Sequence, residues 1–213
     1  MRLTGYFKLL SHTRFLVKRL ERRFISESVK EKYYEKVVDI GAGVSPYRKY
    51  LNCKHYLAVD CEDRQGSNEV LLADINKGIP LEDGYADLVL CTEVLEHIKE
   101  PRFALSELRR IIKENGEIII MTPFSWPLHE EPNDYFRYTR YGLEYLLAEA
   151  GFKEIDIKPA NGFFYTVIQI INIMLIKRIF LPMVIVLNLL GIMIGASKGN
   201  STFPLIYLVR AKI

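Results

Sequence analysis

The sequence has 213 residues, 49% hydrophobic and 26% charged, which is enough to form one globular domain with a buried core. Its net charge of +3 is small for this length and does not by itself suggest nucleic-acid binding, so we expect no nucleic-acid partner. The three cysteines Cys53, Cys61 and Cys91 form no C-x-x-C pair. They predict no disulfide framework and favour a reducing, cytoplasmic compartment.

The chain begins with a basic segment. Residues 1–27 contain seven Lys or Arg and two Glu, with Leu and Phe scattered among them, and lack the continuous apolar stretch of a signal peptide. We therefore expect the protein to stay on the cytoplasmic side. Residues 10–24 are predicted to form a basic amphipathic helix, and we assign 1–35 to an N-terminal arm.

From Val37 onward, short β-branched runs alternate with amphipathic stretches, which predicts crossover units and a mostly parallel sheet covered by helices on both faces. This is the pattern of an α/β, doubly wound fold. The seven predicted strands are residues 37–40, 55–60, 69–73, 86–91, 117–122, 152–158 and 203–212.

Two helices are well marked. One begins at Pro101, places Ala104, Leu105 and Leu108 on one face, and ends before Gly116. The other begins near Thr139 and ends at Gly151.

A glycine-rich turn follows the first predicted strand. In the run Asp39-Ile40-Gly41-Ala42-Gly43, the glycines let backbone N–H groups approach a ligand closely. The second strand ends at Asp60, and because parallel strands end at one edge, its carboxylate should face this turn and accept the hydroxyls of a ribose. The pair predicts an adenosine-type ligand, although dinucleotide enzymes also use it.

The third strand ends in Asp74 followed by Ile75, a pair suited to adenine: the carboxylate accepts from the amino group while Ile75 packs on the ring. The pieces D-I-G-A-G, A-V-D, A-D-I, D-L-V-L, E-V-L-E-H-I and N-G-E-I-I-I then occur in order. In this order the sequence resembles the class I S-adenosylmethionine-dependent methyltransferases, especially the type 11 group that includes ubiquinone and menaquinone methyltransferases. The resemblance covers residues 37–152, with a similar final strand at 205–211.

The resemblance implies a seven-stranded Rossmann-like sheet, S-adenosylmethionine as cofactor and a set of binding residues. The methionine part would lie along the turn, the ribose at Asp60, and the adenine at Asp74 and Ile75. Three residues at the end of the fourth strand would close the pocket. The residues concerned are Asp39, Gly41, Ala42, Gly43, Cys91, Thr92 and Glu93.

The glycine turn departs from the family at one position. Ser45 stands where the family often has a third glycine, and Pro46 stands where a dinucleotide fingerprint requires one. Ser45 and Pro46 would suit the N-cap and first position of a helix. An NAD-dependent oxidoreductase is therefore the weaker alternative.

The loop after the fifth strand is the richest in titratable and aromatic side chains. Its His129 is the candidate catalytic base, because a neutral imidazole can take a hydroxyl proton near pH 7. The alternative is a loop histidine bonded to a nearby carboxylate. For Asp134, Tyr135 and Arg137 we favour a role in holding the loop. Glu93 and His97 are four residues apart and would share a helical face, but we assign no metal ligand.

Residues 162–200 form an apolar, helical insertion before the last strand. Its two apolar halves carry Gln169, Asn172, Pro182 and Asn188, and Lys177-Arg178 separates them, so a membrane-spanning hairpin is disfavoured. We expect residues 162–196, together with 10–24, to make a peripheral contact with the inner face of a membrane. A subunit interface, and so a homodimer, is the alternative.

These observations divide the chain into an arm (1–35), a methyltransferase domain (36–161 and 201–213) and the insertion (162–200). The expected function is methyl transfer to a small or lipid-linked acceptor, with oxygen favoured as the methylated atom. A membrane-associated binding module without turnover is a further alternative.

Overall fold

The computed structural model describes residues 10–64, 66, 69–174, 181–194 and 202–213. Its described residues contain one seven-stranded sheet in the order β3-β2-β1-β4-β5-β7-β6. Only β7 runs antiparallel to its two neighbours, β5 and β6, and the other pairs are parallel. Dinucleotide-binding folds have the order 3-2-1-4-5-6, so the inserted antiparallel strand argues against the nicotinamide alternative.

All seven predicted strands are present, some with longer or shorter bounds than the sequence indicates. The largest change is at β5, which begins directly after a helix and includes Asn115 in a left-handed conformation (φ 65°). The strands are β1 (Tyr34–Ile40), β2 (Cys53–Asp60), β3 (Val70–Leu72), β4 (Ala86–Thr92), β5 (Ile112–Pro123), β6 (Lys153–Pro159) and β7 (Ile206–Lys212).

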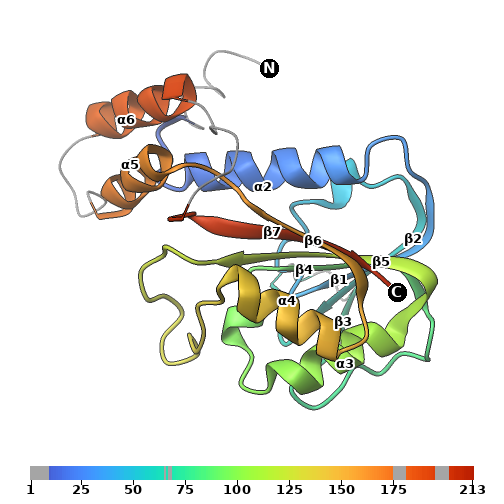
Figure 1. Ribbon diagram of the computed structural model, residues 1–213. Helices are drawn as coiled ribbons and strands as arrows, with labels where there is room; N and C mark the ends of the chain where they lie inside the picture. The colour runs from blue at the N-terminus through green and yellow to red at the C-terminus, as the bar shows by residue number, and fades with distance from the viewer. Residues whose placement is uncertain (1–9, 65, 67–68, 175–180, 195–201) are drawn as a thin grey trace.

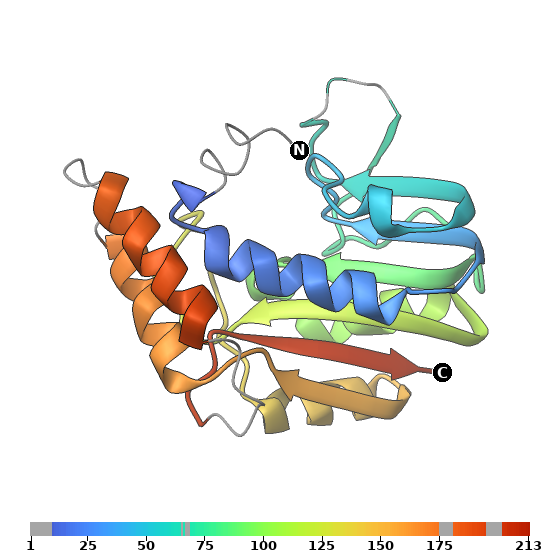
Figure 2. The ribbon, with the colours of Figure 1, turned by 90° about the horizontal axis from the view of Figure 1, so that it is seen from above.

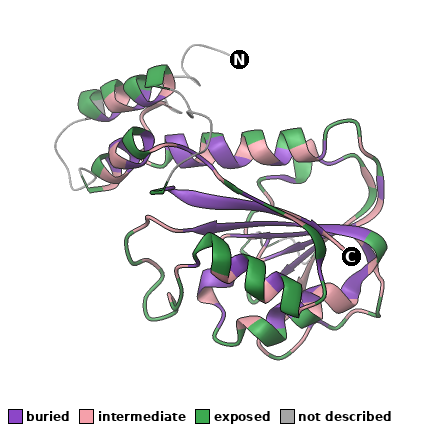
Figure 3. Cartoon of the chain, viewed as in Figure 1, coloured by how far each residue is buried: buried purple, intermediate pink, exposed green. Residues whose placement is uncertain are grey.

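The helices lie on both faces of the sheet (Figure 1). α3 (Pro101–Ile111) and α4 (Arg140–Glu149) pack on one face, whereas α2 (Phe15–Ser28) lies over the other. Because neighbouring residues of a strand point to opposite faces, Val89 belongs to the core beneath α3 and Leu88 to the core beneath α2. Figure 3 shows the buried residues gathered between these layers.

The two predicted helices of the central region are confirmed. Pro101 is the first residue of α3, where its missing N–H removes no hydrogen bond. The Thr139 side chain caps α4 by accepting from the Gly142 backbone N–H at 3.1 Å. Gly151, at φ +90°, follows the end of α4 in a conformation that glycine adopts without strain.

The predicted helix at Ser45 and Pro46 is wrong. Ser45 has φ +50°, which a helix N-cap does not adopt, and residues 41–52 contain only the short 3-10 turn η1 (Arg48–Tyr50). No side chain caps that turn. The face that such a helix would cover is occupied by α2, which comes from the N-terminal segment.

The described part of the arm, from residue 10 onward, packs into the central domain. Phe15, Leu16, Leu20 and Ile25 of α2 are buried in the same core as Leu88. Their burial corrects the expectation that the apolar side of residues 10–24 faces a membrane. Three basic side chains here are exposed: Arg19 and Arg23 of α2, and Arg14 directly before it.

Two helices form the apolar insertion: α5 (Phe163–Met174) and α6 (Leu181–Ile194). They lie side by side at the edge where the parallel strands end, next to the start of α2 (Figure 2). None of the helices formed by the described residues combines the length and apolar character that a bilayer crossing requires. Lys177-Arg178 lies outside the described residues.

Candidate cofactor and acceptor site

The glycine turn after β1 requires its first glycine. Gly41 has φ +64°, and a Cβ atom there would lie 2.2 Å from Val94 Cγ2. The Gly41 backbone N–H donates to the Val59 carbonyl of β2 at 2.8 Å, so the turn is held against the neighbouring strand. Gly43 also has positive φ (52°), but no atom lies within 4 Å of the position that a Cβ would take there. A larger residue at Gly41 would displace Val94, whereas Gly43 serves the conformation of the turn.

Asp60 lies opposite this turn, as the parallel register predicts. Its Oδ2 accepts a hydrogen bond from the Gly43 backbone N–H at 2.8 Å, and its Oδ1 lies 3.4 Å from the Glu62 backbone nitrogen. The side chain lines a cavity of about 610 Å³ at the edge of the sheet. A carboxylate fixed in this position can accept hydrogen bonds from ligand hydroxyls.

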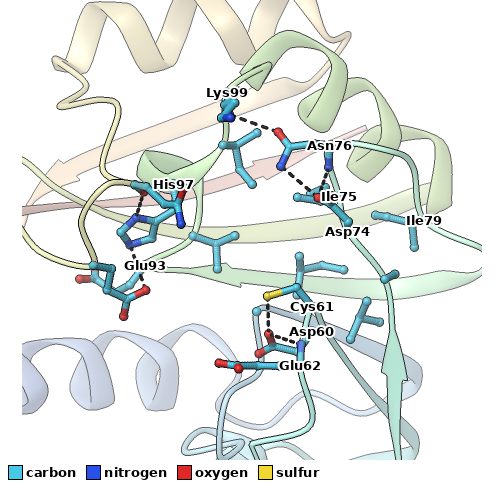
Figure 4. A pocket seen from close by; sticks show the side chains of 18 of the residues that line it. Asp60, Cys61, Glu62, Asp74, Ile75, Asn76, Ile79, Glu93, His97 and Lys99 are labelled. Carbon is cyan, nitrogen blue, oxygen red and sulfur yellow. Dashed lines mark hydrogen bonds and ion pairs between the residues drawn. The ribbon is translucent and has the colours of Figure 1, made fainter.

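Asp74 and Ile75 line the same cavity across from Asp60 (Figure 4). Asp74 Oδ1 accepts from the backbone nitrogen and from Nδ2 of Asn76, both at 3.0 Å. These bonds, and Lys77 beside the other oxygen, hold the pKa of Asp74 below its usual value. Ile75 and Ile79 supply an apolar wall, so this end of the cavity offers both a charged acceptor and a surface for a flat ring.

Two predicted site residues lie beneath the cavity and do not line it. Cys91 is fully buried in the core. Asp39 is 1% exposed, and its Oδ2 accepts from the Tyr56 hydroxyl at 2.6 Å. Burial raises the pKa of Asp39 to about 7, opposed by the Tyr56 hydrogen bond and aided by the nearby Asp60. Both residues support the turn from behind, and Asp39 Oδ1 has no hydrogen-bond partner.

A second cavity of about 400 Å³ adjoins the first, and we call it the acceptor cavity. Gly41, Glu93 and His97 line both cavities. Ala42, Gly43 and Thr92 line only the acceptor cavity. Of the residues predicted at the turn and at the end of β4, all but Asp39 and Cys91 therefore line at least one of the two cavities. Its wall also includes Arg14, Lys18 and Glu21 at the start of α2, and Trp126 and His129 of the loop after β5.

Glu93 stands where the two cavities meet. It has φ +56°, and its Oε1 is buried without a hydrogen-bond partner. Burial, followed by the nearby carboxylate of Glu21, raises the pKa of Glu93 to about 8, while Lys18 and Arg14 oppose the shift. The carboxyl group therefore carries a proton for part of the time near neutral pH.

His129 is held by the carboxylate of Asp134. Asp134 Oδ2 accepts from the His129 backbone N–H at 3.1 Å and lies 3.2 Å from Nδ1 of the imidazole. Arg137 binds both oxygens of Asp134 at 2.6 Å and holds the pKa of Asp134 down to about 2. Burial lowers the pKa of His129, against the opposing effect of Asp134. Nδ1 of His129 also lies 3.4 Å from the Arg137 guanidinium nitrogen Nη2, slightly farther than the Asp134 oxygen. In the tautomer with its proton on Nδ1, directed at Asp134, the Nε2 lone pair is free, which is the form that a general base requires.

His97 and Glu96 are functional candidates that the sequence analysis did not assign. The ring centroids of His97 and His129 are 4.8 Å apart. The backbone N–H of Tyr135 donates to the Glu96 carbonyl at 2.9 Å, so the loop after β5 is fixed to the turn after β4. Glu93 and His97 do not share an α-helix, because η2 (Leu95–His97) is a single 3-10 turn that begins after Glu93. Only the E-H pair in E-V-L-E-H-I signals these residues, and it does not indicate their neighbour His129.

Comparison with known proteins agrees with this arrangement. Residues 38–120 match the model of a methyltransferase domain family. An uncharacterised protein of Methanocaldococcus jannaschii is 30% identical over 99 residues, which cover 35% of this chain and 44% of that protein. The chain spans less than half the length of the curated relatives it matches.

Solved structures share the fold at low sequence identity. A S-adenosylmethionine-dependent methyltransferase from Archaeoglobus fulgidus superposes with a TM-score of 0.59 at 21% identity, covering 94% of each chain. A phosphoethanolamine N-methyltransferase from Haemonchus contortus, in complex with S-adenosylmethionine, has a TM-score of 0.56 at 16% identity, covering 92% of this chain and 51% of that one.

Proposed function

We propose that this chain, which carries a class I S-adenosylmethionine-dependent methyltransferase domain, methylates a hydroxyl group of a lipid-linked acceptor at a membrane surface. The observation that carries the proposal is the meeting of two cavities at Gly41 and Glu93. One is lined by Asp60 at the end of β2 and Asp74 just after β3, and the other by His129.

The cofactor would lie in the larger cavity and extend to the glycine turn. We assign the ribose hydroxyls to Asp60 and the adenine to Asp74 and Ile75. The methionine end would lie beside Gly41–Gly43, at the entrance of the acceptor cavity. This orientation points the sulfonium methyl group toward Glu93 and the histidines.

The transfer itself is an in-line displacement. The acceptor oxygen forms a bond to the methyl carbon, the carbon–sulfur bond breaks, and its electron pair stays on sulfur, giving S-adenosylhomocysteine. We assign the hydroxyl proton to Nε2 of His129, with Asp134 on the opposite nitrogen holding the ring and stabilising the imidazolium. The leaving group is neutral, so positioning supplies much of the catalysis.

Exposed apolar side chains on the insertion support a membrane-bound acceptor. Phe164 and Met174 of α5 and Val186 and Met193 of α6 are 62–82% exposed. Exposed apolar side chains on two packed helices suit an apolar partner. Arg19 and Arg23 are exposed on α2, which contacts α6, and would attract anionic lipid headgroups. These features support a peripheral position on the inner face of a membrane, with a homodimer interface as the alternative.

The decisive experiment supplies S-adenosylmethionine, the full-length protein and extracted lipid fractions, and follows the methyl group by mass spectrometry. We expect a product 14 mass units heavier, about one CH₂, in a lipid-linked fraction. A protein that binds S-adenosylmethionine but yields no S-adenosylhomocysteine with any fraction would instead fit the alternative of a binding module without turnover.

A further inference from the structure

Three potential metal ligands converge at the acceptor cavity. Glu96 and His97 belong to η2, and His129 comes from the loop after β5. One ligand atom from each lies within 4.8 Å of the others. Nε2 of His97 is 3.7 Å from Glu96 Oε1, and Nε2 of His129 is 3.9 Å from that oxygen.

The Glu96 carboxylate lacks the partners that a buried charge needs. The residue is 0% exposed, and both of its carboxyl oxygens are buried without a hydrogen bond. Buried polar groups are normally hydrogen-bonded, and an unpaired buried carboxylate is strongly destabilising. Arg137, which lies on the same loop as His129, is bound to both oxygens of Asp134. Glu96 therefore faces two imidazoles with its acceptor capacity unused.

Both imidazoles are oriented by acceptors on their other nitrogen. His97 Nδ1 lies 2.6 Å from the Asn133 carbonyl oxygen, to which it donates. His129 Nδ1 lies 3.2 Å from Asp134 Oδ2, nearer than the Arg137 nitrogen Nη2 at 3.4 Å. With protons on both Nδ1 atoms, both Nε2 lone pairs point toward Glu96. Metal-binding histidines are held in this way, by a carbonyl or carboxylate on the opposite nitrogen.

We propose that Glu96, His97 and His129 bind a divalent transition-metal ion. Ligand atoms about 2.1 Å from a tetrahedral ion stand roughly 3.4 Å apart. The two spacings to Glu96, 3.7 and 3.9 Å, are close to this value, and with all three atoms within 4.8 Å of one another the two imidazoles would move toward each other on ion binding. Two imidazoles and one carboxylate suit zinc, cobalt or iron better than magnesium, which prefers oxygen ligands. His97 and His129 both line the acceptor cavity, where a fourth ligand could enter.

The inference concerns the site of the proposed methyl transfer but rests on ligand geometry alone. A bound ion takes the Nε2 lone pair of His129, so ion binding and a base role for His129 exclude each other. In the ion-bound protein, the cation would hold the acceptor oxygen and lower the pKa of its hydroxyl.

The test uses chelator-treated, full-length protein titrated with Co²⁺ and Zn²⁺ by calorimetry, with the visible spectrum of Co²⁺ as a second readout. We expect one ion per chain and an ion-dependent rise in the unfolding temperature. Glu96→Gln, His97→Gln and His129→Gln should each weaken binding roughly tenfold or more, with loss of the cobalt spectrum. His55→Gln, an exposed histidine on β2 outside both cavities, is the matched control and should bind as wild type does.

Absence of stoichiometric binding to chelator-treated wild type overturns the inference, as does equal affinity in the His55 and His129 variants. Circular dichroism of the ion-free variants shows whether they are folded, so weak binding by an unfolded variant is not counted. Absence of methyl transfer by a protein that binds the ion would contradict the proposed function and leave the ion site standing.

Discussion

Asn172 on α5 donates a hydrogen bond to Asn188 on α6 at 2.9 Å, inside a hairpin whose outer surface is apolar. Asn188 in turn donates to the Leu10 carbonyl at 2.7 Å and to the His12 carbonyl at 3.1 Å. These bonds tie the insertion to the segment that leads into α2. Since Arg14, directly before α2, lines the acceptor cavity, the insertion helps position one wall of the site.

Asn188→Leu should lower the free energy of unfolding by about 1–3 kcal/mol, because it leaves the buried Asn172 amide without its acceptor and the Leu10 carbonyl without its Asn188 donor. Denaturant unfolding monitored by circular dichroism measures this change. Leu189→Ala is the control: Leu189 is adjacent but 45% exposed, so its truncation should change stability by about 0.5 kcal/mol or less. Equal effects of the two substitutions would contradict the role given to Asn188.

Membrane binding should depend on the exposed face of α6. A Val186→Glu and Met193→Glu double variant should lose most of its co-sedimentation with anionic liposomes, because each charge must stay in water. Binding of wild type should weaken partly with salt, as the arginines of α2 are screened, while the apolar contribution persists.

Tyr141→Glu serves as the control for this experiment, since Tyr141 is 79% exposed but belongs to α4 on the other side of the sheet. It should bind liposomes as wild type does. Wild-type protein that remains in the supernatant as a stable dimer would favour the subunit-interface alternative.

In ion-free protein, the rate should follow the ionisation of His129. The neutral imidazole is the base and predominates above its pKa, and burial lowers that pKa below 6.5. The rate should therefore be constant near neutral pH and fall only as the pH drops through this lowered value. His129→Gln should reduce the rate about 10²–10⁴-fold and abolish the acidic limb, with little change in S-adenosylhomocysteine affinity. An unchanged profile would remove His129 from the proposed mechanism.

The pattern of apolar residues and the residues that begin and end helices were sufficient to predict the sheet and the two central helices. Near-continuous apolar runs identify buried parallel strands, and Pro101 and Thr139 mark helix starts by local chemistry. The position of Asp60 opposite Gly43 also follows from sequence, because parallel strands end at one edge. These features depend on neighbours along the chain or on strand register.

The parts that sequence did not predict depend on contacts between distant segments. Nothing near Ser45 indicates that α2 already covers that face of the sheet. Gln169, Asn172 and Asn188 interrupt apolar stretches in sequence, yet in the structure they are buried and bonded. Likewise, His97 and His129 become neighbours only through the loop that binds the turn after β4.

Substitution of Asp60 tests the cofactor assignment most directly. Asp60→Ala should cost about 1.5–3 kcal/mol of binding free energy, because the ribose loses charge-assisted hydrogen bonds and the Gly43 N–H loses its acceptor. Asp156→Ala, a carboxylate on β6 away from both cavities, should leave binding unchanged.

Calorimetric titration of wild type, Asp60→Ala and Asp156→Ala with S-adenosylhomocysteine, and of wild type with NAD, tests the account most directly. We predict one S-adenosylhomocysteine per wild-type chain, a clear loss of affinity in Asp60→Ala alone, and no binding of NAD. Binding of NAD in place of S-adenosylhomocysteine, or an Asp60→Ala affinity within about twofold of wild type, a difference of only about 0.4 kcal/mol, would contradict it.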